Sequence, residues 1–81
     1  MQPVRKNIIG SKLRRLRRAQ GLSVADLAAR LGGRHELDAG ALRAIESQTR
    51  RVRDHEVLAL ARALGVRVGE LLPARPRRTL R

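Results

Sequence analysis

The sequence predicts an all-α domain of five short helices, and three observations favour that fold class. Apolar residues recur at the three- and four-residue spacing of amphipathic helices, and no segment alternates as a strand would. Glycines and small polar residues stand where these patterns begin and end. The 81 residues suffice for one domain, and its core must be aliphatic because the chain contains no Phe, Trp or Tyr.

The first helix is expected from about Asn7 to Gln20. Its apolar face is formed by Ile9, Leu13 and Leu16. Gly21 follows, at a position where a left-handed residue often ends a helix.

The second helix is expected to begin after Ser23, which forms the pattern of a capping box with Asp26. Gly32 and Gly33 end this helix. Its apolar stripe consists of Leu27, Ala28 and Leu31.

After a loop at residues 34–36, Asp38 is expected to cap a third helix that runs to about Gln48. Leu42 and Ile45 face inward in this helix. Residues 49–53 form a basic connector to the next helix.

A fourth helix is expected to be capped by Asp54 and closed by Gly65. Its inward side is predicted to consist of Val57, Leu58, Ala61 and Leu64. A short fifth helix over 66–72 ends before Pro73. The predicted divisions are a flexible arm (1–6), a folded domain (7–72) and a disordered basic tail (73–81).

The net charge of +12 favours a polyanionic partner, with nucleic acid first and an anionic membrane second. The chain has no apolar run long enough for a membrane span, no aromatic anchor for lipid and no signal-like N-terminus, so we expect a cytoplasmic, nucleoid-associated protein. It contains no cysteine, and His35 and His55 are isolated, so no metal or other cofactor is expected. No catalytic constellation is present, and we expect no enzyme activity.

Residues 23–46 have the order of a helix-turn-helix, a layout that small bundles without DNA-binding activity also use. Four phrases make the pattern more specific. They are LRRAQGLS (16–23), DLAARLG (26–32), LRAIE (42–46) and LALARALGV (58–66). With them the chain, from about Ile9 to Leu72, resembles the phage-repressor and Cro-type, or lambda-repressor-like, helix-turn-helix regulators.

The resemblance implies a compact five-helix bundle and a transcriptional regulator that binds double-stranded DNA. The expected function is that of a Cro-like phage-type repressor, which binds an operator as a homodimer through the helix at 38–48. The alternative is a protein-interaction module of antitoxin or anti-repressor type, with a second protein as partner and little base readout. The small residues of the third helix keep that alternative open.

The resemblance also assigns residues. Arg17 and Glu46 occupy the positions of a structural ion pair. Base contacts fall to Ala39, Gly40, Arg43, Ala44, Ser47 and Gln48. Backbone contacts fall to Arg14, Arg18, Ser23, Arg34, His35, Arg50, Arg51 and Arg53. The predicted dimer patch is Val66, Val68, Leu71 and Leu72, for which packing within the monomer is an equal alternative.

The chain departs from the family pattern in three places. Val24 stands where the family commonly has Gln at the start of the second helix, so a polar donor to phosphate is lost. The turn before the third helix is longer than usual. Gln48 stands where the family commonly has glycine, so a different exit turn is expected.

Overall fold

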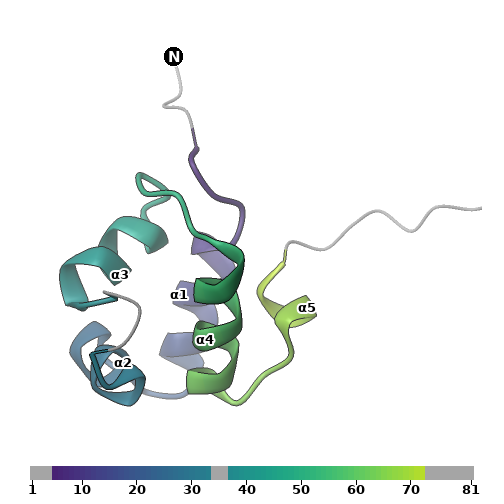
Figure 1. Ribbon diagram of the computed structural model, residues 1–81. Helices are drawn as coiled ribbons and strands as arrows, with labels where there is room; N and C mark the ends of the chain where they lie inside the picture. Colours follow the sequence, from purple (N-terminus) through teal and green to yellow (C-terminus); the bar gives the residue numbers. More distant parts are fainter. Residues whose placement is uncertain (1–4, 34–36, 73–81) are drawn as a thin grey trace, which may run out of the picture.

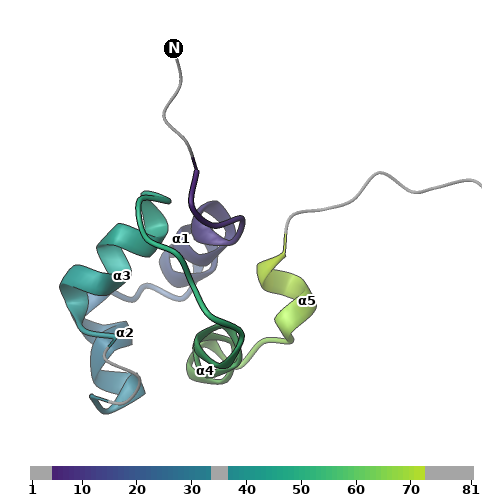
Figure 2. The ribbon, with the colours of Figure 1, turned by 45° about the horizontal axis from the view of Figure 1, so that its top comes forward.

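The computed structural model describes residues 5–33 and 37–72, and its helices confirm the predicted all-α class (Figure 1). They are α1 (Gly10–Ala19), α2 (Val24–Leu31), α3 (Ala39–Glu46), α4 (Asp54–Leu64) and α5 (Val68–Leu71). These two segments contain no strand. In Figures 1 and 2, α2 and α3 lie on one side of α1 and α4, and α5 lies on the other. The predicted basic tail, 73–81, is outside the described residues.

Helices α2 and α3 begin and end at the local signals in their sequences. The Ser23 hydroxyl accepts a hydrogen bond from Asp26 N at 2.9 Å, and the Asp26 carboxylate accepts one from Ser23 N at 2.8 Å. Asp38 accepts a bond from Ala41 N at 2.8 Å at the start of α3. Gly32 ends α2 with a φ of 66°, a left-handed conformation that glycine adopts without steric cost.

Two helix starts differ from the predictions. Asp54 is the first residue of α4 rather than its cap, and Glu56 accepts the hydrogen bond from Arg53 N at 2.9 Å. Helix α1 begins at Gly10, three residues later than expected. The Asn7 side chain accepts a bond from Gly10 N at 2.8 Å, so it caps the helix from outside.

One side chain of α4 faces the opposite way from the prediction. Leu58 has half of its surface exposed, whereas Leu60 is fully buried. The side that faces the core carries Val57, Leu60, Ala61 and Leu64, spaced i, i+3, i+4 and i+7. Leu58 lies one residue, about 100°, round the helix from Val57 and so falls outside this stripe.

The core is entirely aliphatic and draws on every helix. Its buried members are Ile9, Leu13, Leu27, Leu31, Leu37, Leu42, Ile45, Leu60, Ala61, Leu64 and Leu71. Leu37 comes from the end of the long turn, to which the sequence pattern assigned no core role. Leu71 was predicted to belong to a dimer patch, with packing inside the monomer as an equal alternative, and it is fully buried inside the monomer. No helix of the described segments is long and apolar enough to cross a bilayer.

The start of α1 touches the end of α3 at a contact that we call the α1–α3 junction, formed by Asn7, Gly10 and residues 45–50. The buried Asn7 amide donates to the carbonyl oxygens of Ile45 at 3.0 Å and of Arg50 at 2.8 Å. A Cβ on Gly10 would overlap the Ile45 carbonyl oxygen and lie 2.9 Å from that of Glu46. The two helices therefore approach each other through backbone, and only glycine fits at position 10.

We expect Gly10→Ala to lower the free energy of unfolding by about 1–3 kcal/mol, because the added methyl group forces α1 and α3 apart. Gly40→Ala is the matched control, since a Cβ there meets only the Asp38 carboxylate at 3.5 Å. It should leave stability unchanged or raise it by up to about 1 kcal/mol. Urea denaturation followed by circular dichroism measures both. Equal effects of the two substitutions would contradict the close approach at position 10.

Candidate nucleic-acid interface

The outward face of α3 carries small side chains and one cation. Leu42 and Ile45 are fully buried and fix which side of the helix faces the core. Gly40, Arg43 and Ser47 are exposed, at the spacing of a single stripe, and Ala39 and Ala44 are half-buried beside them. Arg43 is thus the only charged side chain on this stripe. Because most of these side chains are short, another molecule can approach the backbone of α3 closely.

Arg17 and Glu46 tie α3 to α1, as the family resemblance implies. Arg17 Nε lies 2.6 Å from Glu46 Oε2 and Nη2 lies 2.9 Å from Oε1, so the pair is bidentate. Arg17 Nη1 also donates to the Leu22 carbonyl oxygen at 2.7 Å. The two side chains are 10% and 8% exposed. The hydrogen bond to Glu46 raises the pKa of Arg17 although burial opposes it.

Arg14 and Arg18 lie along the edge of α1 that faces α3. Gly10 and Arg17 both touch α3, and Arg14 is four residues from the first and three from the second. Arg14 therefore projects from the same side of the helix, and Arg18 follows one turn later. Both are exposed. On α3, Arg43 stands three residues before Glu46. Arg14 and Arg43 thus flank the buried ion pair on its solvent side.

The start of α2 offers a weaker anion contact than expected. Ser23 is exposed, but its backbone N–H already donates to Asp26 and its hydroxyl oxygen already accepts from Asp26 N. The hydroxyl hydrogen also bonds to the Asp26 carboxylate, so Ser23 keeps no free donor for a phosphate. Hydrogen bonds from the Ser23 backbone and side chain lower the pKa of Asp26, so a carboxylate charge stands beside this site.

Arg50, predicted to contact a DNA backbone, instead holds the connector between α3 and α4. Its guanidinium nitrogens lie 3.1 and 3.2 Å from the carboxylate oxygens of Glu56, which is 96% buried. Burial raises the pKa of Glu56, but hydrogen bonds from Arg50 and from Arg53 N, with the charges of Arg50 and His55, lower it overall. Arg51 and Arg53 are exposed on the same connector.

Gln48 also lies away from the outward face of α3. Its φ of 64° is left-handed, a conformation that glycine adopts readily, at the turn that follows α3. Its side-chain amide donates to the Asn7 carbonyl oxygen at 3.1 Å, and its own carbonyl accepts from Lys6 N. Gln48 belongs to the α1–α3 junction and is removed from the predicted base contacts.

The remaining predicted residues fall into three groups. Arg34 and His35 lie outside the described residues. The Ser47 hydroxyl donates to the Ala44 carbonyl oxygen at 3.1 Å and lies 3.0 Å from the Thr49 hydroxyl. Val66, Val68 and Leu72 are half-buried at the α5 end of the molecule.

Asn7 was not identified from the sequence, although its place before the first apolar stripe is typical of a capping residue.

Most described carboxylates serve the fold itself. Asp26, Asp38, Glu46, Glu56 and Glu70 each accept at least one hydrogen bond within the chain. The exposed cations of α1, α3 and the connector are therefore not neutralised by these groups. The result is an excess of exposed positive charge on α1, α3 and the connector that follows α3, which fits a polyanion.

Helix α2 is followed by a turn and by the exposed helix α3, and exposed arginines stand nearby on α1 and the connector. This arrangement defines a helix-turn-helix DNA-binding domain. Comparison with protein families agrees: residues 13–71 match the model of the helix-turn-helix family HTH_3, and the chain belongs to this family of DNA-binding regulators. Comparison with curated proteins and with solved structures gave no significant match.

The lowered pKa of Glu56 predicts that its contribution to stability is present near neutral pH. It should be lost as the pH falls through the folded-state pKa, because the folded protein binds the proton less readily than the unfolded chain. Glu56→Gln should therefore be less stable than the parent protein at pH 7, and the difference should narrow below about pH 4. Thermal unfolding measured from pH 7 to pH 3 tests this expectation. A constant difference across the range would mean that the charge on Glu56 does not act through the pair with Arg50.

Proposed function

We propose that this protein is a sequence-specific transcriptional regulator, most simply a Cro-like repressor, that binds operator DNA as a dimer. The observation that carries the proposal is the arrangement of α3. Its exposed stripe of small residues around Arg43 lies between Arg14 and Arg18 on α1 and Arg51 and Arg53 on the connector. A helix of this kind fits the major groove while the flanking arginines bind phosphates.

Arg43 is the base reader that we favour on chemical grounds. Arginine donates two parallel hydrogen bonds to O6 and N7 of guanine, the commonest specific contact in the major groove. Ala39, Gly40 and Ala44 form no such bonds, but alanine packs on a thymine methyl group and glycine lets the helix axis approach the base edges. Ser47 has a hydroxyl that accepts or donates at the far end of the stripe. Specificity from so few polar readers depends in part on DNA shape.

A single helix with one arginine reads too few base pairs for a unique operator, so the proposal includes a second copy of the chain. The surface that we assign to the dimer is the half-buried group Val66, Val68 and Leu72 around α5. Leu71 supports this surface from inside the core. Because α5 lies on the opposite side of α1 and α4 from α3, a contact there leaves both recognition helices free (Figures 1 and 2).

The alternative function, a protein-interaction module of antitoxin or anti-repressor type, draws on one feature. A face of alanine and glycine suits close packing against a helix of a second protein as well as it suits DNA. The exposed arginines near α3 favour DNA binding, because an uncharged helix of a partner protein would form no ion pairs with them. A stoichiometric complex with a neighbouring gene product, without any DNA shift, would favour the alternative.

Two arginine substitutions should separate base reading from phosphate binding. Arg43→Ala should weaken binding to the operator by about 1–3 kcal/mol and reduce discrimination at one base pair, with little change on random DNA. Arg51→Ala should weaken operator and random DNA alike and reduce the slope of log affinity against log salt by about 1. Fluorescence anisotropy with both duplexes over a salt series measures this. If the two variants behave alike, Arg43 is not a base reader.

The dimer should protect two half-sites on the DNA upstream of the gene. Their centres should lie about 34 Å, or one helical turn, apart and form an inverted repeat. Hydroxyl-radical footprinting gives the spacing directly. Protection of one half-site, or uniform protection of any duplex, would oppose the operator-binding dimer.

A further inference from the structure

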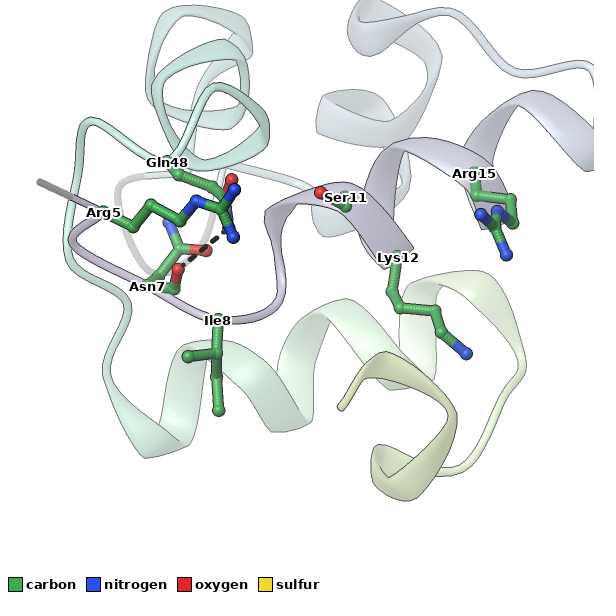
Figure 3. Close-up of a pocket in the computed structure, with 7 residues that line it drawn as sticks. All are labelled: Arg5, Asn7, Ile8, Ser11, Lys12, Arg15 and Gln48. Carbon is green, nitrogen blue, oxygen red and sulfur yellow. Dashed lines mark hydrogen bonds between the residues drawn. The ribbon is translucent and has the colours of Figure 1, made fainter. Parts of the chain in front are cut away.

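A shallow pocket lies at the start of α1, outside the surface that we assign to DNA. Its volume is about 270 Å³, and its walls include Arg5, Ile8, Ser11, Lys12 and Arg15 (Figure 3). The side chains of Ile8, Lys12 and Arg15 extend to the same side of the chain. Asn7 and Gln48 form its floor, joined by the hydrogen bond described above. The floor therefore belongs to the rigid α1–α3 junction, which holds the pocket open.

The floor of the pocket adjoins the end of α3, but part of its wall lies on the outer side of α1. Gly10 marks the edge of α1 that touches α3, and Lys12 lies two residues, about 200°, round the helix from it. Arg15 is one turn beyond Lys12 on the same outer side. Arg15 also adjoins Arg18, three residues along α1, whereas Lys12 is turned away from the edge that touches α3. Ile8 and Lys12 are thus the part of the pocket that we assign to a second partner.

The chemistry of the pocket combines positive charge with an exposed aliphatic side chain. Its walls carry three cations and no carboxylate, and none of Arg5, Lys12 and Arg15 forms an ion pair within the described segments. Ile8 has 64% of its surface exposed, more than any other large hydrophobic residue described. A single exposed aliphatic residue is common on protein surfaces, so it is the combination of Ile8 with three cations in one concave site that distinguishes this pocket.

We propose that this pocket binds an acidic segment of a partner protein. Carboxylates of the partner pair with Lys12, Arg15 and Arg5, and one aliphatic or aromatic side chain of the partner packs on Ile8. Charge complementarity selects the acidic partner, and the concave, partly apolar surface selects a peptide over a nucleic-acid backbone. A phosphate backbone would pair with the cations and leave Ile8 in water. The inference does not depend on the DNA-binding proposal, because Ile8 and Lys12 are not among the residues that we assign to DNA.

The experiment uses the full chain, free and saturated with a DNA duplex, at physiological salt. The probe is a fluorescein-labelled peptide of glutamates around two leucines, and the matched probe has serines in place of the leucines. Anisotropy gives the affinities, and amide chemical shifts give the site. We expect the largest shifts at Ile8, Ser11 and Lys12, and similar affinity with and without the duplex.

Variants of the protein test whether these residues form the binding site. The double reversal Lys12→Glu with Arg15→Glu should weaken binding of the leucine peptide at least about tenfold. Ile8→Ser should weaken it about fivefold and should remove the preference for leucine over serine. The control is Arg62→Glu with Arg67→Glu, which changes the net charge equally at exposed positions of another surface. This control should keep most of the affinity.

Three results would overturn the inference. The first is an equal loss of affinity in the control and in the double reversal, which would mean only general attraction by the net charge. The second is equal affinity for the leucine and serine peptides. The third is displacement of the peptide by a second duplex with shifts at Ile8 and Lys12, which would assign the pocket to DNA. Loss of operator binding by the control would bear on the proposed function alone.

Discussion

The orientation of α3 depends on its polar attachment to α1. The helix has eight residues, and Leu42 and Ile45 are its only fully buried side chains, so apolar packing alone fixes its axis weakly. Two sets of hydrogen bonds complete the attachment: Asn7 binds the end of α3, and Arg17, about two turns after Gly10 on α1, binds Glu46. A buried pair of this kind costs about 3–5 kcal/mol when one partner is removed. The direction of the recognition surface follows from these contacts.

Local chemistry made much of the fold predictable. The Ser23–Asp26 box, the Asp38 cap and the glycines after α2 and α4 set their helix ends through contacts within three or four residues, which the sequence displays directly. The pair of Arg17 and Glu46 came from the family resemblance. The phase of α4 was mistaken at Leu58, because alanines and leucines on three sides of the helix leave its periodicity weak.

The candidate site was less predictable, because contacts between distant residues decide which arginines are available. Arg50 and Arg51 are neighbours of the same type, yet Arg50 pairs with buried Glu56 while Arg51 is exposed. The sequence predicted Gln48 to be an exposed residue of the third helix, but its left-handed backbone turns its side chain toward Asn7, 41 residues away. No periodicity in a single sequence reports such pairings. The requirement for glycine at position 10 likewise arises from its contact with the end of α3, which the local sequence does not display.

The use of carboxylates as internal hydrogen-bond acceptors has a consequence for how two copies of the chain meet. Most of the negative charge stays within each monomer, so two molecules with a formal charge of +12 each must approach against mutual repulsion. Added electrolyte shortens the range of that repulsion and weakens the grip on phosphates. If the proposed dimer forms, its self-association and its DNA affinity should thus respond to ionic strength in opposite directions, because bound nucleic acid would offset the charge that keeps two copies apart.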